Sequence, residues 1–160
     1  MAENLIFSRR EIAFLRELGR NGVDFMVVGP ASATLQGAPA VTQDIDLWFR
    51  DLSDPGIRKA LDKVGGIYVP PTGGNPPMFA GQNVGLFDIV LRLDGIRPFN
   101  VEVRGAIEVS LGTVKVRLLP LERIIASRKA ANRPEDRASL PMLESALIAI
   151  RERRAKRPKR

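Results

Sequence analysis

Apolar residues recur along this chain with two different periods, and the period indicates the type of each element. In residues 9–18 they are spaced three apart, at Ile12, Leu15 and Leu18, which is typical of a helix with one buried face. Residues 23–28 form a nearly continuous apolar run, which is typical of a strand that enters the core. The same reasoning predicts helices over residues 9–18, 31–36, 54–64, 121–131 and 134–154, and strands over residues 23–28, 42–49, 86–91, 99–103, 106–110 and 113–118.

Proline and glycine interrupt this pattern at two places. Residues 65–82 contain pairs such as Pro70-Pro71 and Gly73-Gly74, so we expect a long loop or an irregular hairpin there. A loop of this length in a compact domain is more often functional or mobile than incidental. Pro141 lies inside the last predicted helix, which it should kink or restart.

The positive charge of the chain is concentrated at its C-terminal end. Of the net charge of +7, residues 151–160 contribute +6, and the remainder of the 160 residues is nearly neutral, with no internal repeat. We therefore predict one α/β (α+β) domain over residues 1–150 and a basic tail over residues 151–160. The tail either attracts nucleic acid or an acidic partner by counterion release, or is the solvated end of a helix, where cations are favourable.

The composition excludes several kinds of chemistry. The chain has no Cys and no His, so it forms no disulfide or thiolate zinc site and lacks the commonest metal ligand and acid–base group. Any bound metal must be held by oxygen atoms, which favours Mg²⁺ or Mn²⁺. The N-terminus lacks a signal-peptide pattern, and no segment approaches the roughly 20 apolar residues of a membrane span. We expect a cytoplasmic protein with no membrane association.

Three aspartates set in apolar sequence are the strongest indication of a functional site. Asp44 and Asp46 alternate with apolar residues, so a strand would carry both carboxylates on one face. Asp88 lies inside the apolar run of residues 86–91, where an unpaired carboxylate is unfavourable. If the two strands are neighbours, the carboxylates converge, and a divalent cation would relieve their repulsion. The residues alone leave an alternative open, in which Asp44 and Asp46 are simply solvated and a nearby Lys or Arg neutralises Asp88.

The same aspartates carry a resemblance to a known family. Val28-Gly29-Pro30, followed after a spacer by Asp44-Ile45-Asp46-Leu47, resembles the signature of the nucleotidyltransferase superfamily (polymerase-beta-like). Phe87-Asp88-Ile89-Val90 matches the third acidic residue that this family carries on a later strand. Residues 121–136 resemble the helix and turn of small bacterial nucleotidyltransferase-like proteins, including those of abortive-infection and toxin–antitoxin systems. The resemblance spans residues 22–145.

The resemblance implies a fold, a reaction and a metal site. It implies a mixed central β-sheet with flanking helices, and transfer of a nucleoside monophosphate from an NTP to a hydroxyl on RNA, protein or a small molecule. Asp44, Asp46 and Asp88 would be the catalytic residues and the ligands of Mg²⁺ or Mn²⁺. Lys129 and its neighbour Arg128 match a basic stretch of the family, and we expect Lys129 to bind the nucleotide. Pairing of Lys129 with an acidic neighbour is the alternative.

The nucleotide-binding half of the site departs from the family pattern. Gly29 matches the pattern and would approach the triphosphate together with the start of the following helix. The next residue of the pattern, Gly or Ser, is Pro30 here, which has neither an N–H nor a hydroxyl. Ser32 or Thr34 could supply the missing hydroxyl, and we expect Ser32 to bind the nucleotide.

Two hypotheses about function follow from these residues. In the first, the chain is a metal-dependent nucleotidyltransferase. In the second, it is a non-enzymatic module on the same fold, antitoxin-like or RNA-binding through residues 151–160. The second is motivated by Pro30 and by Ala40, which stands where related small proteins often carry Arg. A structural protein without a ligand site is a third reading, but it does not explain Asp88.

Overall fold

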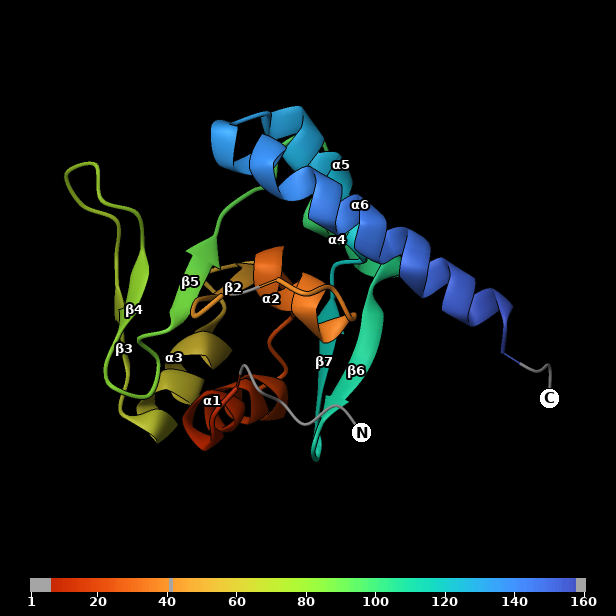
Figure 1. The fold of residues 1–160 in the computed structure, drawn as a ribbon. Helices are drawn as coiled ribbons and strands as arrows, with labels where there is room; N and C mark the ends of the chain where they lie inside the picture. Colours follow the sequence, from red (N-terminus) through yellow and green to blue (C-terminus); the bar gives the residue numbers. More distant parts are fainter. Residues whose placement is uncertain (1–6, 41, 158–160) are drawn as a thin grey trace.

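The computed structural model describes residues 7–40 and 42–157, whose helices and strands follow most of the predicted pattern (Figure 1). The helices are α1 (Arg9–Arg20), α2 (Gly29–Leu35), α3 (Pro55–Val64), α4 (Phe99–Glu102), α5 (Leu121–Ala131) and α6 (Pro134–Ala155), with a 3₁₀ turn at Val103–Gly105. The strands are β1 (Phe25–Val28), β2 (Ile45–Phe49), β3 (Ile67–Val69), β4 (Met78–Ala80), β5 (Phe87–Val90), β6 (Ile107–Leu111) and β7 (Val114–Leu118). None of the helices described is both long enough and apolar enough to cross a membrane.

Five of the strands form one mixed sheet, in the order β5-β2-β1-β7-β6. β2 is antiparallel to β1 and parallel to β5. β1 is also parallel to β7, which forms an antiparallel pair with β6. The predicted α/β fold with a mixed central sheet and flanking helices is therefore confirmed.

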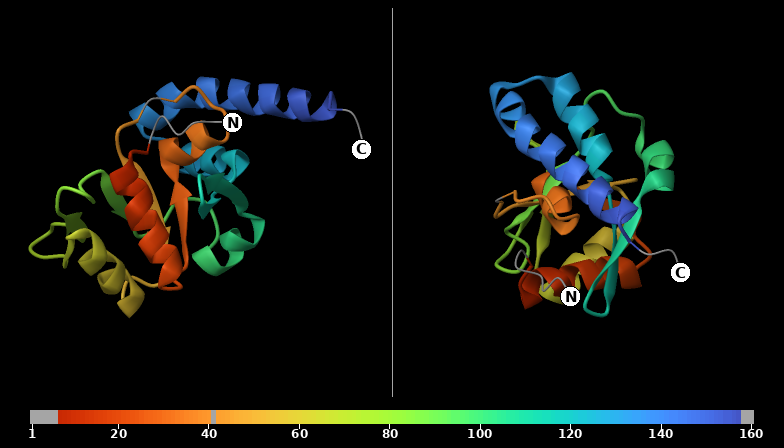
Figure 2. Two further views of the ribbon diagram at one scale, coloured as in Figure 1. Left: turned by 90° about the horizontal axis from the view of Figure 1, so that it is seen from below. Right: turned by 45° about the vertical axis from the view of Figure 1, so that its right-hand side comes forward.

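The sheet separates two apolar cores, because successive side chains of a strand point to opposite faces. On β2, Ile45, Leu47 and Phe49 pack into a first core with α1 and α3, whereas Trp48 packs into a second core with α4, α5 and α6. Figures 1 and 2 show α1 and α3 on one side of the sheet and α5 and α6 on the other. Asp46 is two residues before Trp48 on the same strand, so its side chain is on the same face of the sheet, the face that α5 and α6 cover.

The segment rich in Gly and Pro, residues 65–82, is an irregular hairpin, one of the two forms expected for it. β3 and β4 pair in antiparallel register, separate from the main sheet. At the tip, the backbones of Thr72 and Asn75 exchange hydrogen bonds of 3.2 and 2.8 Å. Tyr68 and Phe79 face the first core, and Phe79 is buried there.

The strand predicted over residues 99–103 is wrong, because residues 99–102 form the short helix α4 and Val103 begins the 3₁₀ turn. A helical turn brings Phe99 and Glu102 to one side, where both are buried, whereas a strand would point them to opposite faces. The ring of Phe99 packs edge-on against Trp48, with centroids 5.4 Å apart. The Glu102 carboxylate accepts hydrogen bonds from the Arg97 backbone N–H at 2.9 Å and from Arg123 Nη2 at 2.7 Å.

Of the two outcomes expected at Pro141, the restart is wrong, since α6 continues through it to Ala155, and the kink stays a prediction. Pro141 leaves the carbonyl of Arg137 without its usual helical donor, but both residues are on the exposed side of the helix, where water can replace that donor.

The division between a domain over residues 1–150 and a tail over residues 151–160 stays a prediction. α6 runs across that boundary, and residues 158–160 lie outside the described residues.

Phe14 of α1 joins the hairpin and the edge of the sheet to the first core. It is fully buried, and its ring packs edge-on against Phe79 and Phe87, with centroids 5.5 and 5.1 Å apart. We expect Phe14→Ala to lower the free energy of unfolding by about 3–5 kcal/mol, because it leaves a cavity in the core. Urea denaturation measures this. Ile148→Ala, at an exposed position of α6, should cost less than about 0.5 kcal/mol, and equal losses would contradict the assignment.

Candidate active site

Strand pairing brings two of the predicted aspartates together in one row across the sheet. Asp46 is directly opposite Asp88 in the parallel β2–β5 pair and directly opposite Val28 in the antiparallel β1–β2 pair. Gly29 follows Val28 immediately, so it lies next to this row, where β1 ends and α2 begins. Asp44 precedes β2. Asp46 is half-buried, whereas Asp44 and Asp88 are exposed.

The carboxylates lie close enough for the pKa values of Asp46 and Asp88 to be raised. Burial, helped by the charges of Asp88 and Asp44, raises the pKa of Asp46 from 3.8 to about 6, although Arg128 acts in the opposite direction. Burial and the charge of Asp44 also raise the pKa of Asp88. In the described part of the chain, no Lys or Arg forms an ion pair with any of the three. Among the described residues, Asp88 therefore has no Lys or Arg that neutralises it through an ion pair, as the alternative required.

The oxygen donors fit a hard divalent cation, although they do not form a complete site. Carboxylates are the ligands that Mg²⁺ and Mn²⁺ prefer, and the repulsion at Asp46 and Asp88 is what such a cation would relieve. Within residues 7–40 and 42–157, no three acidic side chains are grouped closely enough to enclose a metal ion. Asp44, Asp46 and Asp88 as a set of metal ligands stay a prediction, with Asp46 and Asp88 as the pair that strand register supplies.

Gly29 brings the backbone close to the Asp46 carboxylate. Its φ is +65°, and a Cβ at this position would collide with Oδ2 of Asp46. Only glycine combines this left-handed conformation with the absence of a side chain. Pro30 follows in the first turn of α2, where a missing N–H removes no helical hydrogen bond. The departure from the family pattern at Pro30 is thus compatible with the local backbone.

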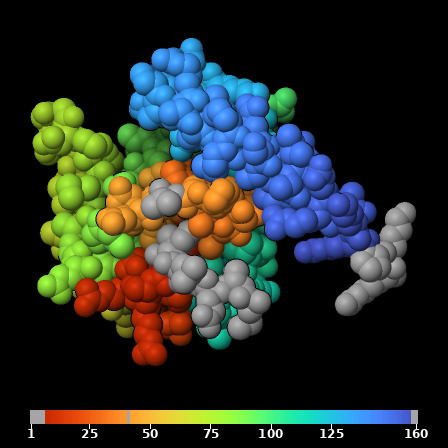
Figure 3. Space-filling view, in the orientation of Figure 1, coloured from red at the N-terminus to blue at the C-terminus, as the bar shows by residue number. Residues whose placement is uncertain are grey.

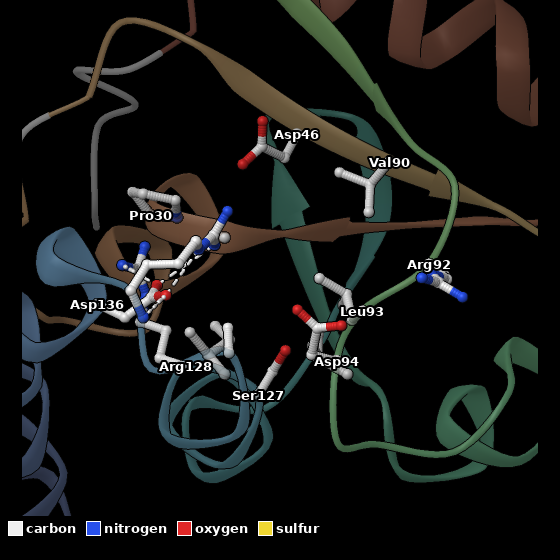
Figure 4. A pocket seen from close by; sticks show the side chains of 14 residues that line it. Pro30, Asp46, Val90, Arg92, Leu93, Asp94, Ser127, Arg128 and Asp136 are labelled. Carbon is white, nitrogen blue, oxygen red and sulfur yellow. Dashed lines mark hydrogen bonds and ion pairs between the residues drawn. The ribbon is translucent and has the colours of Figure 1, made fainter. Parts of the chain in front are cut away.

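A cleft of about 260 Å³ opens beside Asp46, between the sheet and the α5–α6 pair (Figure 4). Its charged lining residues are Asp46, Arg92, Asp94, Arg128, Arg133 and Asp136. Figure 4 shows Asp46 on one side of the cleft and the hydrogen-bonded group around Asp136 on another. Of the three predicted metal ligands, Asp46 lines this cleft and Asp44 and Asp88 do not. The cleft therefore combines a carboxylate from the sheet with guanidinium groups from the helices.

A buried carboxylate, Asp136, holds two of these arginines in place. Asp136 is 1% exposed and accepts hydrogen bonds from the backbone N–H and Nε of Arg133, at 3.1 and 2.8 Å. Nη1 of Arg128 lies 3.5 Å from Asp136 and donates to Oγ of Ser139 at 2.9 Å. Hydrogen bonds from Arg133 and the charges of both arginines lower the pKa of Asp136, although burial opposes them. Asn132, with φ 52°, makes the left-handed turn between α5 and α6 that allows this arrangement.

Two of the predicted nucleotide-binding residues lie outside the cleft. Ser32 is fully buried, and its hydroxyl donates to the carbonyl of Leu119 at 2.9 Å. Lys129 forms an ion pair with Glu144 at 3.3 Å. Adjacent residues of a helix point about 100° apart. Arg128 lines the cleft, whereas the neighbouring Lys129 is directed at Glu144 of α6. The Ser32 hydroxyl thus has a partner within the protein. Ser32 and Lys129 as nucleotide-binding residues stay a prediction.

The sequence interpretation missed Arg133 and Asp136 as members of the site. A signal was present, because two residues three apart at the start of a helix are spaced for a capping interaction, and Pro134 marks the first helical position. Arg92 and Asp94 had no comparable signal. They lie in the segment after β5 that has no periodic pattern, and only the tertiary fold brings that segment to the cleft.

The arrangement of elements is nucleotidyltransferase-like, as comparison with solved structures shows. The crystal structure of ANT(2")-Ia in complex with adenylyl-2"-tobramycin matches with a TM-score of 0.53 and 15% identity, over 89% of this chain and 95% of that one. The solution structure of the antibiotic-resistance factor ANT(2'')-Ia matches with a TM-score of 0.56 and 17% identity, over 91% of each chain. An antigenic nucleotidyltransferase-like protein from Paracoccidioides brasiliensis matches with a TM-score of 0.47 and 17% identity, over 91% of this chain and 88% of that one. No protein-family model and no curated protein sequence matches the chain.

Ionised Asp46 destabilises the folded state. Because its pKa is about 6 when folded and 3.8 otherwise, the folded chain binds the proton more tightly, and the contribution of Asp46 to stability falls as pH rises from about 4 to about 6. We expect Asp46→Asn to be more stable than the parent at pH 7.5, by up to about 3 kcal/mol, and no more stable near pH 4. Urea denaturation at both pH values measures the difference. Asp62→Asn, at an exposed position of α3, should change stability by less than about 0.5 kcal/mol. A less stable Asp46→Asn at pH 7.5 would contradict the prediction.

Asp136 has the opposite effect on stability. Because Arg133 and Arg128 lower its pKa, its contribution is present above about pH 4 and is lost as pH falls further. We expect Asp136→Asn to lower the free energy of unfolding by about 2–3 kcal/mol at pH 7, since it removes charge-assisted hydrogen bonds from a buried position. Thermal unfolding followed by circular dichroism measures it. Glu135→Gln is the matched control. Glu135 is exposed and lies 3.7 Å from Arg133, so its loss should cost less than about 0.5 kcal/mol.

Proposed function

We propose that this chain is a metal-dependent nucleotidyltransferase, which moves a nucleoside monophosphate from an NTP to a hydroxyl acceptor. The observation that carries the proposal is the in-register pair of Asp46 and Asp88, beside a cleft that Arg128 and Arg133 also line. Carboxylates for a divalent cation and guanidinium groups for phosphates are what this reaction requires. The nucleotidyltransferase-like fold supports the same reaction class.

Asp46 and Asp88 would hold Mg²⁺ or Mn²⁺, together with Asp44. When bound, the cation would neutralise charge on the attacking and leaving oxygen atoms of the transfer. The raised pKa values of Asp46 and Asp88 support this role, because they reflect burial and, to a smaller extent, the negative charges of the neighbouring aspartates, both of which a bound cation would offset. Chemistry of this kind does not need His, which the chain lacks.

The residues of the chain divide the remaining work between them. Arg128 and Arg133 would bind the β- and γ-phosphates, since a guanidinium can donate two parallel hydrogen bonds to phosphate oxygens. Gly29, whose backbone approaches the Asp46 carboxylate, would lie next to the α-phosphate. Asp88 would accept the proton of the acceptor hydroxyl while the hydroxyl oxygen forms a bond to the α-phosphorus. The bond between that phosphorus and the oxygen bridging to the β-phosphate then breaks, and pyrophosphate leaves.

The acceptor hydroxyl would belong to RNA, a protein or a small molecule. One of the structures with the same fold is a complex with adenylyl-2"-tobramycin, which supports a nucleotide as the common partner. In this chain, Arg92 and Asp94 also line the cleft and would contact the acceptor. We place the reaction in the cytoplasm, where nucleoside triphosphates are available.

Calorimetric titration with each NTP, with and without Mg²⁺, tests the proposal. We expect Asp46→Asn combined with Asp88→Asn to weaken Mg²⁺-dependent binding by about 100-fold or more, because it removes the paired metal ligands. Transfer of label from α-³²P-NTP to RNA, protein or small-molecule fractions should be lost in the same variant.

A second double variant, Asp62→Asn with Glu108→Gln, is the control for this experiment. It removes the same number of carboxylates from exposed positions on α3 and β6, so binding and transfer should not change. Mg²⁺-dependent NTP binding that survives in the Asp46 and Asp88 variant would refute the proposal.

A further inference from the structure

The C-terminal part of α6 carries a cluster of cations that the fold does not neutralise. The cluster consists of the exposed residues Arg151, Arg153, Arg154, Lys156 and Arg157. Among the described residues, none of the five takes part in an ion pair, and Glu152 is the only acid within their stretch. This end of α6 extends beyond the body of the molecule (Figures 2 and 3). Like charges three and four residues apart on a helix repel one another, so a polyanion would stabilise this end of α6.

Two of these arginines line a groove instead of projecting freely into solvent. Leu147, Ile150, Arg151 and Arg154 lie on one face of α6 and line a groove of about 230 Å³. Leu147 and Ile150 pack against the second core, so the same face changes from apolar to cationic where the body of the molecule ends. The other side of the groove includes Gly105, Ile107, Pro120 and Glu122. The groove thus has a cationic wall opposite a wall with one carboxylate.

We propose that this groove docks the phosphodiester backbone of double-helical RNA. Arginine suits phosphate because its planar guanidinium can donate two hydrogen bonds to one phosphate group, and Arg151 and Arg154 present two such groups along one line. No aromatic side chain is among the described residues that line the groove, so it offers backbone contacts and no platform for stacking unpaired bases.

The carboxylate of Glu122 favours RNA over DNA in the same groove. A carboxylate repels phosphate, but it accepts a hydrogen bond from a ribose 2′-hydroxyl, which DNA lacks. Double-helical RNA presents 2′-hydroxyls and phosphates together across its wide minor groove, and this is the combination that Glu122, Arg151 and Arg154 match. The docking site does not depend on the proposed nucleotide transfer, because the groove shares no lining residue with the cleft.

Fluorescence anisotropy of the full chain with a labelled RNA duplex of about 16 base pairs, in buffer without NTP, tests the inference. We expect Arg151→Gln with Arg154→Gln to weaken binding by about tenfold or more, and to reduce the slope of log K against log salt by about 2, since two phosphate contacts are lost. Glu122→Ala should reduce the preference for the RNA duplex over a DNA duplex of the same sequence.

Lys59→Gln with Lys63→Gln is the matched control, because it removes the same charge from exposed positions on α3, on the other side of the sheet. Circular dichroism checks that all variants fold. Equal weakening by the two double variants would overturn the inference, since it would indicate net charge alone. Tighter binding of single-stranded RNA or of the DNA duplex, or stronger binding of polyglutamate or of phosphatidylserine vesicles through the same arginines, would overturn it as well.

Discussion

The candidate site depends on the register of one strand, β2. Asp46 stands opposite Val28 on one side and opposite Asp88 on the other, so a single row across three strands brings the residues of the site together. A shift of one residue would turn Asp46 toward α1 and α3 and would direct Ile45 or Leu47 at the cleft. The register is fixed because the apolar residues that alternate with Asp46 are fully buried in the first core. Packing on one face of the sheet thus determines the chemistry on the other.

The two halves of the cleft are stabilised in different ways. On the sheet side, Asp46 keeps a carboxylate half-buried without a cationic partner, which makes the fold less stable than a neutral side chain would. On the helix side, Asp136 is nearly inaccessible, but its hydrogen bonds to Arg133 and its proximity to Arg128 keep it ionised. The unfavourable carboxylate lies on a central strand with a well-packed opposite face. Its position is therefore maintained by the surrounding structure and does not depend on its own interactions.

Sequence periodicity was sufficient for the parts of the site that lie on regular elements. It predicted the strands that carry Asp46 and Asp88, because alternation and apolar runs report burial directly. It could not show that these strands are neighbours, since their parallel pairing is set by how the whole sheet packs. It assigned a strand to residues 99–103 because a four-residue helix is shorter than the pattern needed to recognise it. It could not show which of Arg128 and Lys129 faces the cleft. The rotation of α5 about its axis decides this, and that rotation is set by contacts with α6 and the second core.

The left-handed residue Asn132 makes the number of residues between the two arginines as important as their identity. Arg128 lies on α5 before the turn, whereas Arg133 and Asp136 lie at and after it. One residue inserted in this stretch within α5 would rotate Arg128 by about 100° about the helix axis and shift it by about 1.5 Å, away from Asp136. Exposed positions here can therefore accept other side chains, but an insertion or deletion would separate the arginine pair. Among related sequences, constant spacing across this turn would identify a functional cleft even where the flanking residues differ.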